Sequence, residues 1–540
     1  MIASYFFYLL FSFQTVDLGF SILLINFKEE LPMMGKVYSA GVYGVKAELI
    51  EVEADVTAGI PYFELTGNLS NTVKEAKDRV RMAIKNSYIK MNPARIVVNL
   101  APANIRKSGP HFDLAMAISV LCAMGVVDNR KVENMLFVGE LGLDGAVNPV
   151  NAVLPIIDCA REHKISTCIV PCRNAKEGAL IEGVKVIGVH SLKECIEYIN
   201  GAVFIEPVGS IKVNEESNSW YKSFDDIKGQ EGLKRALLIG AGAMHNILMI
   251  GPPGSGKTMA ASRIPTIMPP MNREQIIEVS RIYSIAGLLD EDMFYVKNRP
   301  FRTPGSGITV SAFVGGGYNP IPGELSLSEH GVLFLDELNL FKPEVVESLR
   351  VPLETGKVMV NRLHGVYEYP ARFMLVAAIN PCKCGYYPDS RCTCSENDIA
   401  RHLGKISRPI MDRIDMCVQA PKVGYEYVEN TTIKPGYSGE EMRQQILKIQ
   451  DIQNQRFEKF PYKYNSQIPI NKIEYFCQME QEARDLLKEV YNKYDLSVRA
   501  YHKLMKVART IADLENHDII EFSDIAEAFG YRIAEVSDGK

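Results

Sequence analysis

The segment NILMIGPPGSGKT, residues 246–258, constrains the fold of this chain more than any other. An apolar strand, a glycine-rich loop and the start of a helix follow one another there, which is the context that a phosphate-binding loop requires. The glycines let backbone N–H groups turn inward around phosphate oxygens, Lys257 brings a positive charge to the β- and γ-phosphates, and Thr258 offers a hydroxyl to Mg²⁺. An ordinary glycine-rich turn is the alternative, but it does not account for Lys and Thr directly after the last glycine. The predicted nucleotide-binding residues are Gly251, Pro252, Pro253, Gly254, Ser255, Gly256, Lys257 and Thr258.

Two further apolar strands are predicted to end near this loop. GVLFLDE, residues 331–337, ends in Asp336 and Glu337. In a phosphate-loop enzyme the first carboxylate would hold Mg²⁺ through water, and the second would polarise the water that attacks the γ-phosphate. RFMLVAAIN ends at Asn380, which could position that water. A solvated acidic strand end is the alternative for the two carboxylates. The combination predicts an ATPase that uses ATP and Mg²⁺.

The chain has 540 residues, which is too long for one domain and predicts an α/β multidomain protein. Residues 34–205 mix strands with helices, as in an α+β domain, and the polar stretch 206–223 is typical of a linker. In 224–420 short apolar strands alternate with helices, which predicts a parallel sheet with helices on both faces. In 421–540 the strands vanish and four amphipathic segments predict an all-helical domain.

The first 33 residues are apolar enough to suggest a membrane anchor. However, Asp17 interrupts the segment and no Lys or Arg precedes it. Met33 and Met34 directly precede a strand-like segment, so we expect an over-called start and no membrane partner. Eleven cysteines in a long nucleotide-binding chain are expected as reduced thiols, which fits a cytoplasmic location.

Several motifs together resemble a magnesium-chelatase-type AAA+ ATPase, and more specifically the YifB/ComM family, over nearly all residues from 34 on. They are FDDIKGQ (224–230), GPPGSGKT, VLFLDE, the strand-end Asn380, MDRID (411–415) and LSVRAYHKLMKVARTIADL (496–514). The resemblance implies a ribosomal S5/Lon-protease-like α+β N-terminal domain, an AAA+ motor and a helical C-terminal lid domain. It also implies that Arg413 is an arginine finger, that Arg499 is the sensor-2 arginine, and that the chain forms a ring, typically a homo-hexamer. Without the resemblance, the alternative to these catalytic roles is that both arginines form ordinary salt bridges at the protein surface.

A β-hairpin that turns near His364 is predicted in VMVNRLHGVYEYPARF, residues 358–373. In AAA+ helicase relatives a hairpin here projects into the central pore. Arg362 and His364 could then contact a phosphate backbone, while Tyr367 or Tyr369 stacks on exposed bases. A surface hairpin with no role in DNA binding is the alternative interpretation. One basic residue provides little positive charge for binding DNA, and the net charge of -5 gives the protein no general positive field. Family members are linked to DNA processing, including branch migration during natural transformation, so the resemblance implies a DNA helicase or branch-migration motor.

Two other functions are alternatives to a DNA motor. GELGLDGAVNPVNAVLP (139–155) and KSGPHFD (107–113) resemble the Lon protease fold, which needs a Ser nucleophile and a Lys. The nucleophile position falls at about His111, expected on a surface turn, and the Lys position at about Leu154, so peptidase activity is not expected. The third function is a magnesium-chelatase-like metal-insertion motor for a tetrapyrrole, although no porphyrin-binding segment is recognisable.

Four cysteines lie close together in NPCKCGYYPDSRCTC, a Cys-rich loop over residues 382–394. Cys382, Cys384, Cys392 and Cys394 form two CxC pairs that could close a tetrahedral, structural Zn²⁺ site. The spacing differs from the CxxC of zinc ribbons, so free reduced thiols are the alternative.

The chain departs from its family after RPFR. Relatives usually carry a His-His-Thr run there, whereas this chain has Gly305, Ser306 and Gly307. Any role of those histidines in the pore or at a subunit interface is therefore in doubt for this chain.

Overall fold

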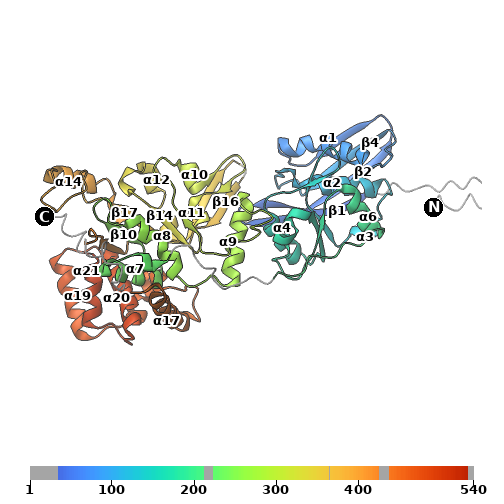
Figure 1. The fold of residues 1–540 in the computed structure, drawn as a ribbon. Helices are drawn as coiled ribbons and strands as arrows, with labels where there is room; N and C mark the ends of the chain where they lie inside the picture. Colours follow the sequence, from blue (N-terminus) through green and yellow to red (C-terminus); the bar gives the residue numbers. More distant parts are fainter. Residues whose placement is uncertain (1–33, 212–222, 364, 425–436, 533–540) are drawn as a thin grey trace, which may run out of the picture.

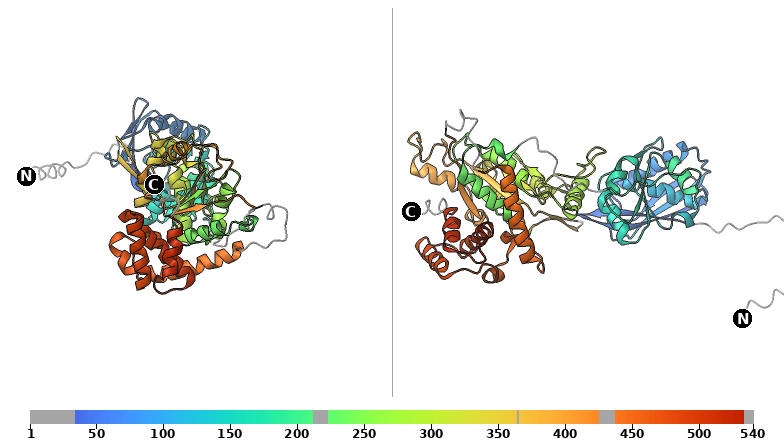
Figure 2. Two further views of the ribbon diagram at one scale, coloured as in Figure 1. Left: turned by 90° about the vertical axis from the view of Figure 1, so that its left-hand side faces the viewer. Right: turned by 60° about the horizontal axis from the view of Figure 1, so that its bottom comes forward.

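The computed structural model describes residues 34–211, 223–363, 365–424 and 437–532, so the apolar segment 1–33 lies outside the described residues. Within those ranges, no helix combines the length and apolar character needed to cross a bilayer. An N-terminal lobe lies at one end of the molecule, a second sheet forms the centre, and the C-terminal helices pack along one side of that centre (Figure 1, Figure 2).

The N-terminal lobe is built on a seven-stranded mixed sheet with strand order β3–β4–β2–β1–β5–β8–β9. The strands β1, β2 and β4 pair antiparallel, whereas β5, β8 and β9 pair parallel. The strands are β1 (Gly35–Tyr43), β2 (Lys46–Ala58), β3 (Tyr62–Thr66), β4 (Ala94–Ala101), β5 (Met135–Phe137), β8 (Thr167–Pro171) and β9 (Lys185–Val189), with the short pair β6 (Glu140–Leu141) and β7 (Val147–Asn148).

Helices cover this sheet according to their apolar pattern. In α1 (Asn71–Asn86) the residues Val73, Ala76, Val80 and Ala83 recur at helical spacing and are buried, and Ser70 caps the first turn by accepting from the Val73 N–H. Helix α2 (Asp113–Ala123) is apolar all round and lies inside the lobe. The remaining helices are α3 (Asn129–Val132), α4 (Val153–Glu162), α5 (Ala175–Gly178) and α6 (Leu192–Asn200).

The central sheet has five parallel strands in the order β11–β14–β17–β10–β18. The inner strands β14, β17 and β10 are apolar throughout, as expected for strands with both faces covered: Met249 and Val376 enter one core, and Leu248 and Leu375 enter the other. The strands are β10 (Ile247–Ile250), β11 (Phe301–Arg302), β14 (Val332–Leu335), β17 (Met374–Ile379) and β18 (Met416–Gln419). Their parallel direction brings residue 251, residue 336 and residue 380 to one edge, which confirms the parallel sheet predicted from the alternating pattern.

The helices and hairpins of the central unit surround this sheet. The longer helices are α7 (Glu231–Ala243), α8 (Lys257–Ile267), α9 (Arg273–Ala286) and α14 (Glu396–Leu403). The short elements are α10 (Val310–Val314), α11 (Glu324–Leu327), α12 (Pro343–Glu347), α13 (Pro352–Thr355), α15 (Arg408–Met411), the pair β12 (Gly315–Gly316) and β13 (Ile321–Pro322), and the hairpin β15 (Lys357–Arg362) and β16 (Gly365–Pro370).

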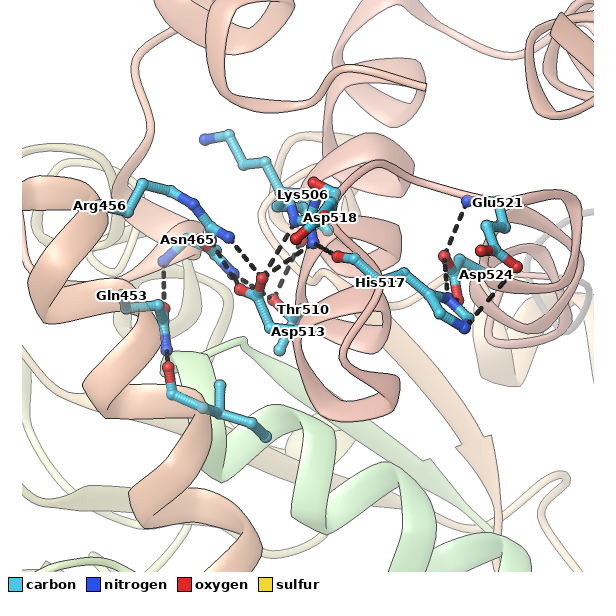
Figure 3. A network of polar contacts seen from close by, with 12 residues as sticks. Gln453, Arg456, Asn465, Lys506, Thr510, Asp513, His517, Asp518, Glu521 and Asp524 are labelled. Carbon is cyan, nitrogen blue, oxygen red and sulfur yellow. Dashed lines mark hydrogen bonds and ion pairs between the residues drawn. The ribbon is translucent and has the colours of Figure 1, made fainter. Parts of the chain in front are cut away.

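The C-terminal region is helical over its described residues, as its 3.6-residue periodicity predicts. A buried polar network holds it together (Figure 3): the Asp513 carboxylate accepts from Arg456, Asn465 and Arg509. Gln453 extends the network to the centre by donating to the Gly242 carbonyl of α7 at 2.9 Å. The helices are α17 (Gly439–Phe457), α18 (Ile473–Phe476), α19 (Gln481–Lys493), α20 (Val498–Glu515) and α21 (Phe522–Gly530).

The N-terminal lobe contacts the centre through α9 and the β15–β16 hairpin. On α9, Arg281 pairs with Asp158 at 2.6 Å and the Ser284 carbonyl accepts from the Ala152 N–H. The turn between β1 and β2 meets the hairpin, where the rings of Tyr43 and Tyr367 stack with centroids 6.5 Å apart. Both α9 and β16 lie on the side of the centre that faces the lobe (Figure 1).

Candidate nucleotide site

The predicted phosphate-binding loop joins the end of β10 to the start of α8. A side chain cannot be accommodated at Gly251, because a Cβ there would lie 2.2 Å from the Ala420 carbonyl oxygen. Gly254 and Gly256 have φ angles of 75° and 84°, a region that favours glycine. Gly256 is the N-cap of α8 and brings no side chain to its first turn. The N–H groups of that turn therefore face the loop and can receive a phosphate.

Lys257 is the cation of this loop. Its ammonium donates to the carbonyl oxygens of Gly251 (2.7 Å) and Pro252 (3.0 Å) and to Oδ1 of Asn380 (3.2 Å). Burial lowers the pKa of Lys257, whereas the charges of Asp336 and Glu337 raise it. The contact with Asn380 joins the loop to the end of β17.

The acidic end of β14 meets the loop at Thr258. The Thr258 hydroxyl donates to Oδ2 of Asp336 at 2.7 Å, which places a hydroxyl and a carboxylate where oxygen ligands for Mg²⁺ are needed. Glu337 is exposed and has a φ of 51°, a left-handed conformation that non-glycine residues adopt at a cost of about 1–3 kcal/mol. Nδ2 of Asn380 lies 3.5 Å from Oε1 of Glu337. The fold thus brings the predicted loop, carboxylates and amide together.

Two residues that contact this edge, His402 and Gln230, are not among the predicted site residues. The imidazole Nε2 of His402 lies 3.1 Å from the Asn380 carbonyl oxygen and 3.1 Å from Nδ2 of Asn339. Gln230 donates to the carbonyls of Ser255 (2.7 Å) and Pro421 (2.6 Å). The motif FDDIKGQ marks Gln230, but no local pattern singles out His402, because its partners come from other segments.

The two candidate arginines lie elsewhere. Arg413 precedes β18, at the opposite edge of the sheet from the loop, where Asn246 at the start of β10 donates to its carbonyl. Its guanidinium donates to the carbonyls of Arg350 and Pro409 and to Oε2 of Glu354 at 2.7 Å. Arg499 lies 3.7 Å from the other oxygen of Glu354. The structure therefore brings the two arginines together at Glu354 and away from the phosphate loop of their own chain.

Three family descriptions match the chain in order. "Subunit ChlI of Mg-chelatase" matches residues 52–174, "Magnesium chelatase, subunit ChlI" matches 223–428, and "Magnesium chelatase, subunit ChlI C-terminal" matches 436–532. Competence protein ComM of Haemophilus influenzae is 38% identical over 92% of this chain and 97% of its own length. The YifB protein of Escherichia coli is 35% identical over 92% of this chain and 96% of its own. The chain belongs to the YifB/ComM family of magnesium-chelatase-type AAA+ ATPases.

This chain has a weaker similarity to Lon proteases over part of its length. Lon protease 2 of Bacillus subtilis is 27% identical over 34% of this chain and 37% of its own length. The expectation that His111 is a surface turn residue is wrong. It is 8% exposed, its ring lies against Phe112 with centroids 4.1 Å apart, and its Nε2 is 3.1 Å from the Ala40 carbonyl oxygen. Burial lowers its pKa to about 4 although the Ala40 contact raises it. Leu154, at the Lys position of Lon, is buried in α4.

The predicted hairpin forms from β15 and β16, but not all of the residues predicted to contact DNA are exposed on it. His364 lies outside the described residues. Arg362 is exposed and donates to the carbonyls of Gly317 (3.0 Å) and Asn361 (2.8 Å). The expectation that Tyr369 could stack on a base is wrong, because its ring is fully buried and its hydroxyl donates to the Pro320 carbonyl. Leu363, at the tip, is 100% exposed.

Gly305, Ser306 and Gly307, where a departure from the family pattern is expected, lie in a surface loop between β11 and α10. Gly305 and Gly307 are exposed, and a Cβ at either would meet nothing within 4 Å. The loop has room for larger side chains, so the small residues at this place are not required by packing.

Proposed function

We propose that this chain is the subunit of an ATP-hydrolysing ring motor that remodels DNA, as a helicase or branch-migration enzyme does. The observation that carries the ATPase part is the convergence of Lys257, Thr258, Asp336, Glu337 and Asn380 at one edge of the central sheet. A strand-end carboxylate pair beside a phosphate loop is the arrangement that phosphoryl transfer uses.

Each of these groups has a separate task. The N–H groups at the start of α8 bind phosphate oxygens, and Lys257 exchanges its carbonyl partners for the β- and γ-phosphates. The hydroxyl of Thr258 and the carboxylate of Asp336 would hold Mg²⁺, which neutralises charge on the phosphates. Glu337 accepts the proton of the attacking water, and Asn380 orients that water through its amide.

The ring part is supported by the position of the arginines. The charge that develops on the γ-phosphate needs a guanidinium, yet Arg413 and Arg499 lie at the opposite edge of the sheet. In a ring, that edge of one subunit can face the phosphate loop of the next, because a head-to-tail interface joins two different surfaces. Both arginines then serve the neighbouring subunit in a homo-hexamer.

The DNA part is supported by a relative and by the hairpin. ComM is named a competence protein, and the resemblance drawn from the sequence motifs links this family to DNA processing. The hairpin presents Leu363 fully exposed, with Val366 (61% exposed) and Met359 (57%) beside it. Apolar side chains of this kind can wedge between bases and separate them, while Arg362 lies next to the tip for phosphate contact.

The test is the ATPase rate of the full chain with no DNA, single-stranded DNA, duplex DNA and a four-way junction. We expect DNA to raise the rate, and Glu337→Gln, which retains ATP binding, to lower hydrolysis by orders of magnitude in every condition because the water-polarising carboxylate is gone. Leu363→Ser should keep the rate without DNA but lose junction unwinding. A rate that no DNA changes would contradict the DNA part, and a Glu337→Gln variant with full activity would contradict the ATPase site.

One other function has an observation in its favour. The matching family descriptions name magnesium chelatase, so a metal-insertion motor for a tetrapyrrole is the second candidate. It predicts ATP-dependent Mg²⁺ insertion into a porphyrin and a rate indifferent to DNA. Measuring both reactions on the same preparation separates the two.

A further inference from the structure

The Cys-rich loop 382–394 brings its four thiols together in space. The Sγ atoms of Cys382 and Cys384 are 3.3 Å apart, those of Cys382 and Cys392 are 3.7 Å apart, and those of Cys384 and Cys392 are 3.6 Å apart. Cys394 completes the group, in which all four Sγ atoms lie within 4.8 Å of one another. These distances are far longer than the S–S bond of about 2.05 Å, so the sulfurs are not disulfide-bonded.

The spacing matches a metal site. With Zn–S bonds of about 2.3 Å, a regular tetrahedron has S···S edges of about 3.8 Å. The observed separations of 3.3–3.7 Å are close to this edge. Four thiolates around one centre leave no coordination position for water.

The surrounding backbone holds the sulfurs in place. The Tyr387 N–H points to Sγ of Cys382 at 3.5 Å, and the Gly385 N–H donates to the Cys382 carbonyl at 3.0 Å. The Cys392 N–H donates to the Asp389 carbonyl, and the Asp389 side chain is paired with Arg391 at 2.8 Å. Hydrogen bonds of this kind orient the ligands of a metal and support its charge.

We propose that Cys382, Cys384, Cys392 and Cys394 bind one structural Zn²⁺ ion. A tetrahedral set of four sulfurs suits Zn²⁺ or iron, and Zn²⁺ is the ion that closes such a site without redox chemistry. The metal site itself does not depend on the proposed motor function, whereas its role beside the nucleotide site rests on the proposed ATP site.

The Cys-rich loop lies beside the nucleotide site, so a bound ion there can stabilise the phosphate loop. Cys382 follows the strand-end Asn380 by two residues, and a Cβ at Gly385 would lie 2.5 Å from Cδ of Pro253 in the phosphate loop. The loop therefore packs directly on the phosphate loop. By fixing the loop's shape, Zn²⁺ braces Pro253 and Asn380 in the positions that ATP binding requires.

The test is the metal content of the full chain, expressed in zinc-supplemented medium and purified with a reductant and without chelator. Elemental analysis should find close to one zinc and almost no iron per chain. The double variant Cys392→Ser with Cys394→Ser should lose the zinc, whereas Cys172→Ser, an exposed cysteine of the N-terminal lobe, should keep it. Protein loaded with Co²⁺ instead should show the visible absorption of a tetrahedral thiolate site.

If the double variant fails to fold, the native protein still decides the question. A mercurial reagent should release one zinc as it titrates the four loop thiols. A zinc content near zero in the native protein, zinc retained by a folded double variant, or iron in place of zinc would each overturn the site. The bracing role is tested separately: a folded, zinc-free variant should bind a fluorescent ATP analogue several-fold more weakly, and an unchanged affinity would overturn that role.

Discussion

Arg413 gives the sharpest prediction about the proposed ring, because it lies at the opposite end of the strands from the phosphate loop of its own chain. It lies before β18, while the phosphate loop follows β10, the parallel neighbour of β18. Four residues of strand at about 3.3 Å each separate the two edges by about 13 Å, more than an arginine side chain spans. If Arg413 stabilises the transition state in a neighbour, Arg413→Ala should lower hydrolysis by about 10³-fold.

Mixing two inactive variants tests this directly. When Arg413→Ala and Lys257→Ala subunits form mixed rings, some interfaces combine an intact loop from the first with an intact arginine from the second. In an equal, random mixture about one interface in four has this combination, so up to about a quarter of the native rate should return if the sites act independently. The assay is the ATPase rate across mixing ratios, with mixed rings confirmed by native mass spectrometry.

The matched control is a mixture of Glu337→Gln with Lys257→Ala. Both lesions lie on the loop side of the active site, so every interface keeps one defect and no activity should return. If the Arg413→Ala mixture also stays at background at all ratios, the assignment of Arg413 to the neighbouring subunit is refuted.

Further changes test the loop and the C-terminal helices. Lys257→Ala should weaken ATP binding by about 10- to 100-fold because a charged hydrogen bond to phosphate is lost, and an unchanged affinity for a fluorescent analogue would contradict the site. Asp513→Asn should lower the free energy of unfolding by about 3–5 kcal/mol, since the buried Arg509 and the partly buried Arg456 lose their counter-charge; denaturant titration showing under about 1 kcal/mol would contradict it. A hydrogen bond to Asp524 raises the pKa of His517, so its contribution to stability is present below the unfolded value of about 6.5 and disappears as pH rises through the folded pKa. His517→Asn should therefore lower the melting temperature at pH 5 more than at pH 9, and an equal shift at both would contradict the ion pair.

Local sequence determined much of the fold and of the nucleotide site. The apolar strands that end in Asp336 and Asn380, and the glycine loop before Lys257, could be read directly, because strand, loop and helix signals lie within a few residues of each other. Once these strands are parallel, their ends must meet at one edge of the sheet. The predicted site residues on the loop and strand ends are therefore close together in space.

Other features were decided only by tertiary structure. The pairing of Arg413 and Arg499 with Glu354 joins three segments that are distant in the chain. The buried His111 and Tyr369 likewise find their polar partners, the Ala40 and Pro320 carbonyls, in distant segments. The CxC spacing left zinc and free thiols as alternatives, and only the turns of the loop set the distances between sulfurs on which the zinc proposal rests. A local pattern specifies which element a residue belongs to, but the partner of a polar side chain is fixed by the packing of elements that the pattern does not describe.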